Sequence, residues 1–85
     1  MKLVNIGFGN MVCAERVVSV ISPDSAPIKR IVQEAKEEKR LIDATQGRKT
    51  KAVIFTDSDH IVLSYLTAEK LKERFTENVE GEEYE

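Results

Sequence analysis

Three stretches of the sequence are apolar at nearly every consecutive position, and this pattern constrains the fold most. They are Val17–Ile21, Ala52–Phe55 and Ile61–Leu63. Successive side chains of a β-strand point to opposite faces of the sheet, so a strand that is apolar throughout needs cover on both faces. The sequence therefore predicts short strands in a sheet with apolar layers on two sides.

One segment has the periodicity of a long amphipathic helix. Ser25 is a suitable N-cap, Pro27 fits the first helical turn, and the pattern continues to about Lys39. The positions that share the i, i+3, i+4, i+7 spacing of one apolar face are Ile28, Ile31, Val32 and Ala35. A second, short helix is expected from Thr67 to about Phe75.

The expected fold is α+β: a small, mainly antiparallel sheet of about five short strands with one long amphipathic helix and a short C-terminal helix. The strand at 41–45 precedes the loop that leads into the next strand. A hairpin with its turn at Asp57-Ser58-Asp59 joins the last two strands. The expected strands are residues 2–6, 11–22, 41–45, 52–56 and 61–66.

The long helix can cover only one face of such a sheet. A second copy of the chain is the simplest cover for the other face, so the sequence predicts a homo-oligomer. The alternative is that the C-terminal helix covers the second face with Leu71 and Phe75.

Charge is distributed unevenly along the chain. The formal net charge is −2, but all thirteen Lys and Arg residues precede Thr76, whereas residues 77–85 contain five Glu and no cation. Residues 1–76 therefore carry a net charge of +3 and are expected to form the single domain. Residues 77–85 are expected to be a mobile acidic tail that competes with nucleic acid for a basic surface.

Several classes of function lack their sequence features. Cys13 is the only cysteine and His60 the only histidine, so neither a disulfide nor a metal cluster is expected, and no catalytic pair is present. We therefore expect no enzyme, cofactor or small-molecule substrate. No apolar run approaches the roughly 20 residues that span a bilayer, and the N-terminus does not resemble a signal peptide, so a cytoplasmic protein without a membrane partner is expected.

The segment 41–51 contains a glycine followed by a group of cations. Gly47 frees the backbone, and Arg48, Lys49 and Lys51 place three positive charges within four positions. Such a loop is either a solvated basic turn or an anion-binding loop. Repeated around a symmetric assembly, it becomes a basic stripe that suits the phosphates of double-stranded DNA.

Three further cations are candidates for the same role. Lys29 and Arg30 lie near the N-terminal end of the long helix, where cations oppose the helix dipole. Arg16 interrupts an apolar strand and is either paired with Glu15 or directed at a ligand.

Several motifs, in this order and at this spacing, resemble the RemA family of bacterial extracellular-matrix regulators. The similarity extends from residue 2 to about residue 66. Its motifs are Asn5-Ile6-Gly7-Phe8-Gly9-Asn10, Ile21 to Arg30, Leu41 to Thr45 followed by Gly47-Arg48, and Asp57-Ser58-Asp59-His60.

The resemblance implies an oligomeric, ring-forming DNA-binding activator of biofilm-matrix genes. It places DNA-contacting residues at Arg16, Arg48 and Lys49. The chain departs from the family at Lys49 and Lys51, where arginine is frequent, and lysine keeps the charge but loses the bidentate fork. The alternative function is a general RNA-binding or protein-interaction ring that uses the same basic loop.

Overall fold

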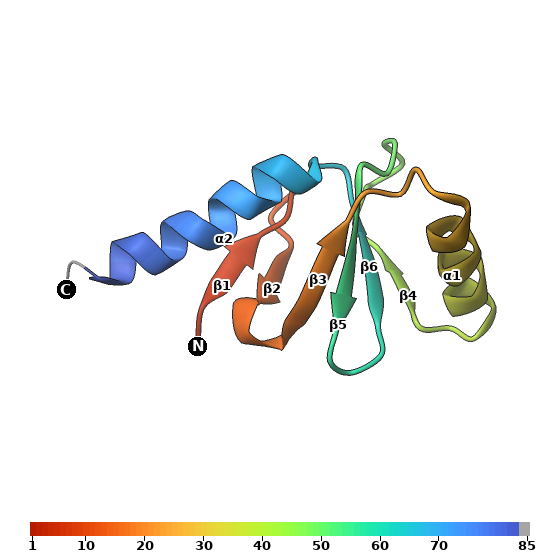
Figure 1. Cartoon of the computed structure of the whole chain (residues 1–85), viewed down its shortest axis with the longest axis horizontal. Helices are drawn as coiled ribbons and strands as arrows, with labels where there is room; N and C mark the ends of the chain where they lie inside the picture. Colours follow the sequence, from red (N-terminus) through yellow and green to blue (C-terminus); the bar gives the residue numbers. More distant parts are fainter. Residues whose placement is uncertain (84–85) are drawn as a thin grey trace.

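The computed structural model describes the backbone of residues 1–83 and the side chains of residues 1–76. Figure 1 shows a sheet region with one helix against it and a second helix that leads away to the C-terminus. The strands are β1 (Leu3–Asn5), β2 (Met11–Cys13), β3 (Val17–Ile21), β4 (Leu41–Asp43), β5 (Ala52–Thr56) and β6 (Ile61–Ser64), and the helices are η1 (Ala14–Arg16, a 3-10 turn), α1 (Ala26–Glu37) and α2 (Ala68–Glu83).

The α+β class is confirmed, but the arrangement of the strands differs from the expected single sheet. β1 and β2 form a separate antiparallel ribbon, and the other four strands form a sheet in the order β3-β5-β6-β4. The β5–β6 hairpin is confirmed, with Ala52 opposite Ser64 and Phe55 opposite Ile61. β4 is parallel to β6. The connection from β3 through α1 crosses one face of the sheet, so β4 joins the opposite edge and runs in the same direction as β3.

The expected strand at residues 11–22 is in fact two strands, because η1 turns the chain between them. The Glu15 carboxylate, within this turn, accepts hydrogen bonds from the Cys13 thiol at 3.0 Å and the backbone N–H of Lys2 at 3.2 Å. These contacts lower the pKa of Glu15 to about 2. The turn sends β2 into the ribbon and β3 to the edge of the sheet.

The helix caps follow the sequence. Ser25 Oγ accepts a hydrogen bond from the N–H of Ile28, and Thr67 Oγ1 accepts one from the N–H of Lys70. α1 ends at Glu37, two residues before the expected end, because Lys39 has a positive φ of 63° and the N–H of Arg40 bonds back to the Ala35 carbonyl.

α2 is longer than the short helix that the sequence predicts. It has 16 residues and extends well past Phe75, away from the sheet (Figure 1). Its backbone includes residues 77–83 of the acidic segment. The mobility expected of residues 77–85 stays a prediction, because residues 84 and 85 and the side chains from 77 onward lie outside the described part of the chain.

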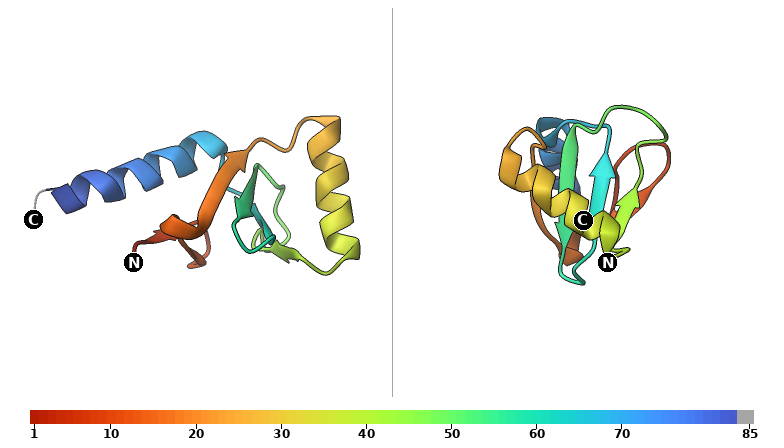
Figure 2. Two further views of the ribbon diagram at one scale, coloured as in Figure 1. Left: turned by 60° about the horizontal axis from the view of Figure 1, so that its bottom comes forward. Right: turned by 90° about the vertical axis from the view of Figure 1, so that its right-hand side faces the viewer.

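Both faces of the four-stranded sheet are covered within one chain, as Figure 2 shows from two further directions. α1 covers one face, where Ala35 packs with Val53, Ile61 and Leu63. The β1–β2 ribbon and the start of α2 cover the other face, where the buried residues are Ile6, Ala44, Ala52, Ile54, Val62 and Leu71. The expectation that a second copy covers a bare sheet face was therefore wrong. The alternative, in which the C-terminal helix covers that face, is closer to the structure.

Apolar side chains remain exposed at the margins of the sheets. Val18 is 69% exposed on β3 and Ile42 is 50% exposed on β4, and these strands are the two edges of the four-stranded sheet. Leu3 and Met11 are exposed on the β1–β2 ribbon. Unpaired strand edges with exposed apolar side chains are the places where another chain can add to a sheet.

Candidate nucleic-acid interface

Both ends of the segment between β4 and β5, residues 44–51, are fixed to β6. We call this segment the basic loop. The N–H of Ala44 donates to the Leu63 carbonyl at 3.0 Å, and the N–H of Lys51 donates to the Ser64 carbonyl at 2.9 Å. Because β6 lies in the middle of the sheet, the loop projects from a rigid base.

The first half of the loop is shaped by hydrogen bonds of one carboxylate. Asp43 Oδ1 accepts from the backbone N–H of Thr45 at 2.9 Å and from its hydroxyl at 2.6 Å. Both bonds favour the charged form and lower the pKa of Asp43. The chain then turns through positive φ at Gln46 (54°) and Gly47 (83°), so the backbone freedom expected of Gly47 is used.

The three cations of the loop are exposed and have no carboxylate partner among the described side chains. Arg48, Lys49 and Lys51 are all exposed, and none of the ion pairs within residues 1–76 includes them. The Arg48 guanidinium instead lies 5.9 Å from the centre of the Phe8 ring. The loop therefore presents to solvent three positive charges that form no ion pair with a described side chain.

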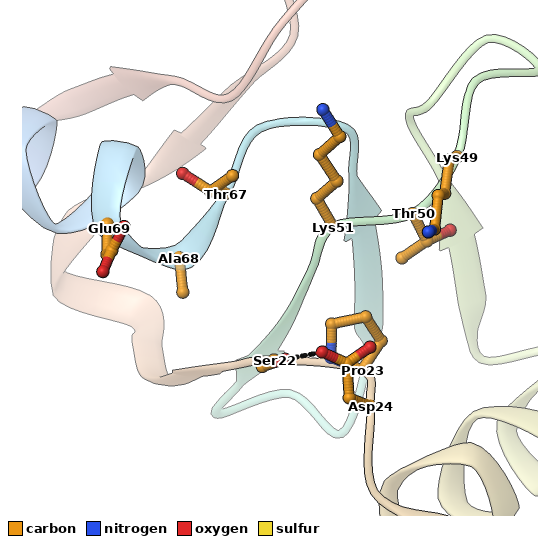
Figure 3. Close-up of a pocket in the computed structure, with 9 residues that line it drawn as sticks. All are labelled: Ser22, Pro23, Asp24, Lys49, Thr50, Lys51, Thr67, Ala68 and Glu69. Atoms are coloured by element: carbon orange, nitrogen blue, oxygen red, sulfur yellow. Dashed lines mark hydrogen bonds between the residues drawn. The ribbon is translucent and has the colours of Figure 1, made fainter.

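A pocket with a volume of about 390 Å³ lies beside the loop (Figure 3). Lys49, Thr50 and Lys51 line one side, and the start of α2 and the segment after β3 line the rest. Asp24 and Glu69 also belong to this lining, so its formal charge is balanced. The positive potential is therefore expected from the tip of the loop rather than from this hollow.

α1 brings one more cation to the same end of the sheet. Lys29 and Thr50 line a common small cavity of about 180 Å³, so the first turn of α1 lies beside the end of the basic loop. Arg30, the next residue, is exposed on α1.

Arg16 lies at the opposite end of the sheet. Its Nε donates to both carboxylate oxygens of Asp57 at 2.8 and 2.9 Å. Of the two alternatives from the sequence, the pairing with Glu15 is therefore not formed, and the ligand contact stays a prediction. This partner raises the pKa of Arg16. β5 separates Asp57 from Lys51, and five strand residues span about 17 Å, so one chain does not bring Arg16 to the basic loop.

The sequence did not indicate the aromatic contact of Arg48. The Phe8 and Tyr65 rings are tilted by 33° with their centres 4.6 Å apart, and both residues are distant from the loop in sequence. The one available signal was the aromatic side chain between Gly7 and Gly9, in a turn where a polar residue is usual.

The described residues include no group of three or more side chains that could together ligate a metal ion. Neither helix, as far as residue 83, has the length and apolar character to cross a membrane.

Comparison with known proteins assigns the family. The model of the family described as "RemA-like: Extracellular matrix regulatory protein A-like" matches residues 3–75. The chain belongs to the RemA-like family. The expected resemblance is thus confirmed and extends into α2.

Relatives within the RemA-like family are described as regulatory. A "Putative regulatory protein" of Halalkalibacterium halodurans is 56% identical over 84 residues, which cover 96% of this chain and 97% of the relative. One of Geobacillus thermodenitrificans is 58% identical over 74 residues, covering 87% and 85%. One of Caldicellulosiruptor saccharolyticus is 60% identical over 77 residues, covering 91% and 76%. These names support a regulatory role rather than an enzymatic one.

Proposed function

We propose that this RemA-like chain is a DNA-binding transcriptional regulator that contacts the phosphate backbone of duplex DNA through the basic loop. The observation that carries the proposal is the set of three exposed cations without a carboxylate partner among the described side chains. Neutralising phosphates with such cations releases counterions and favours binding at moderate salt.

The chemistry of the loop favours phosphate contacts over base contacts. Lys49 and Lys51 are point charges without the planar fork that reads a guanine edge, and Arg48 alone has that geometry. We therefore expect positioning on the DNA backbone to dominate, with sequence preference arising from Arg48 or from DNA shape. We expect Lys29, which lies beside the end of the loop, to extend the same surface, together with the exposed Arg30 that follows it on α1.

The proposal includes assembly of several copies, in which the basic loops repeat along one surface. Apolar side chains exposed at the sheet edges, such as Val18 on β3 and Ile42 on β4, support this assembly. An uncovered sheet face does not, because both faces are covered within one chain. Repetition gives each weak loop an avidity that one chain lacks. It also offers a way for Arg16 of one copy to lie near the basic loop of another.

The genes regulated are proposed from the family alone. The name of the RemA-like family refers to the extracellular matrix, so genes for matrix or biofilm production are the first candidates. A general RNA-binding or protein-interaction ring is the competing function, and it would use the same loop without promoter preference.

A competition experiment separates these functions. Labelled promoter duplex from the host's own matrix genes is bound to the full-length protein in a gel shift, and unlabelled promoter duplex, random duplex and single-stranded RNA compete at two salt concentrations. We expect promoter duplex to compete best and the binding to weaken steeply as salt rises. Equal competition by RNA would contradict the promoter role.

Light scattering at micromolar concentration tests the assembly separately. We expect a mass several times that of the 9.6 kDa chain. A Val18→Glu variant should lower that mass if the edge of β3 is part of the interface, because it places a charge within an apolar contact. A monomer for the wild-type protein would contradict this part of the proposal.

A further inference from the structure

The turn between β1 and β2 reaches the basic loop through a single aromatic residue, Phe8. The Phe8 ring centre lies 5.9 Å from Arg48 Cζ and 4.6 Å from the ring centre of Tyr65. We propose that Phe8 is a positioning residue, which holds the Arg48 guanidinium ready for a DNA phosphate while leaving its charge and N–H donors free. This inference rests on the proposed function, because it explains how the loop's one arginine is presented.

The backbone at Phe8 is in a conformation that bulky side chains rarely adopt. Gly7, Phe8 and Gly9 have φ values of 117°, 56° and 77°. Glycine or asparagine would occupy such a position with less strain than phenylalanine. Backbone hydrogen bonds enforce the turn, among them Ile6 N–H to the Asn10 carbonyl at 2.8 Å. A strained aromatic residue at an exposed turn is best explained by the contact that its ring makes.

The Tyr65 ring packs against both Phe8 and Gly7 of the turn. A Cβ atom at Gly7 would lie only 2.5 Å from Tyr65 Cε1, so the absence of a side chain at Gly7 lets the tyrosine approach. The preceding residue, Ser64, donates from its hydroxyl to the Ile6 carbonyl at 2.8 Å, and its own carbonyl accepts from Lys51 N–H at 2.9 Å. One buried serine thus fixes both the turn that carries Phe8 and the loop that carries Arg48.

An aromatic partner differs from a carboxylate because it leaves the charge and the N–H donors of the guanidinium available to an anion. A ring attracts the guanidinium through its quadrupole and carries no net charge, so the cation keeps its attraction for an anion. It also occupies no N–H donor. Lys49 and Lys51 repel Arg48 within the same loop, and the ring offsets this repulsion without an acidic residue that would repel DNA.

The test uses Phe8→Asn, because asparagine tolerates the positive φ and removes the ring. We expect the thermal stability of the variant to stay close to that of the wild-type protein, because relief of the backbone strain offsets the lost contact with Tyr65. Duplex DNA should bind about two- to five-fold more weakly per contact, as expected for an exposed cation–π contact. Phe8→Tyr keeps the ring and should bind as the wild-type protein does. Phe8→Leu keeps apolar volume without the ring and should bind like Phe8→Asn.

A double-mutant cycle shows whether the effect passes through Arg48. In an Arg48→Ala background, Phe8→Asn should cause no further loss of DNA affinity. In the free protein, NMR should show ring-current shifts of the Arg48 side-chain protons that disappear in Phe8→Asn. A role in folding alone would lower stability and leave no such coupling.

Three outcomes would overturn the inference. Wild-type affinity in Phe8→Asn would mean that the ring does not position Arg48. An equal loss in both backgrounds would mean that Phe8 acts on DNA independently of Arg48. An unchanged affinity in Arg48→Ala alone would overturn the proposed function, and this inference with it, so that arm of the cycle identifies which of the two has failed.

Discussion

Two arginines at opposite ends of the sheet have opposite kinds of partner. Arg16 donates twice to the Asp57 carboxylate, whereas Arg48 faces the Phe8 ring and has no acidic partner among the described side chains. The carboxylate compensates the charge of Arg16 and engages its Nε–H donor, and a ring does neither. The comparison indicates that the end with the basic loop is prepared for an anion, while the Arg16 end is internally compensated.

The largest effect is expected from reversing a charge in the basic loop. Lys49→Glu replaces attraction with repulsion in every copy of an assembly, so duplex affinity should fall by about 100-fold or more. Lys49→Arg keeps the charge and adds the bidentate fork, so it should bind DNA as well as the wild-type protein or better. Gel shifts with the same duplex measure both, and DNA binding by Lys49→Glu at wild-type strength would remove the loop from the interface.

A smaller effect is expected at the Arg16 end. Ion pairs between exposed side chains contribute little to stability, so phosphate can replace Asp57 as the partner of Arg16 at little cost. If Arg16 contacts DNA, Asp57→Asn should strengthen binding by up to about fivefold, because it removes a competing acceptor and a repulsive charge. Arg16→Ala should weaken it. Weaker binding by Asp57→Asn would instead show that Asp57 orients Arg16 toward DNA.

The smallest expected effect is the loss of the stability that Asp43 gives to the basic loop at acid pH. The folded state lowers the pKa of Asp43 through the two hydrogen bonds from Thr45, so the stability that this carboxylate contributes is present above its unfolded pKa of about 4 and is lost as the pH falls through its lower, folded value. The contribution of Asp43 to the shape of the basic loop should therefore be complete above about pH 5. Hydrogen exchange of the Thr45 amide should be faster in Asp43→Ala at pH 7. Unchanged exchange would mean that Asp43 does not hold the loop.

Local chemistry made much of the fold predictable. Ser25, Pro27 and Thr67 mark the helix starts correctly, and the apolar runs of β5 and β6 are buried on both faces as their pattern required. Arg16 marked an interruption of the expected strand, but the η1 turn itself was not predicted, because a 3-10 turn of three residues has no periodicity of its own. The cover of the second face was predicted only in part: the C-terminal helix was one alternative, but β1 and β2 were expected within the single sheet rather than as a ribbon packed on it.

The candidate site was predictable only where its residues are neighbours in the sequence. The cations of the basic loop are adjacent in sequence, so their grouping could be read directly. The partners of the two arginines could not, since Asp57 lies 41 residues from Arg16 and Phe8 meets Arg48 only through the folding of β1 against β6. Long-range contacts of single side chains leave no periodic signal in a sequence.

The dependence of DNA affinity on salt in Arg48→Ala tests the central claim most directly. Lys36→Ala, which removes an exposed cation from the last turn of α1, is the matched control for net charge. We predict that Arg48→Ala weakens duplex binding across sequences and reduces the slope of log affinity against log salt by about 1 for each lost phosphate contact, with thermal stability and oligomer mass unchanged, while Lys36→Ala keeps the wild-type slope. A wild-type slope and affinity in Arg48→Ala, or equal losses in both variants, would contradict the assignment of the basic loop as the DNA-contacting surface.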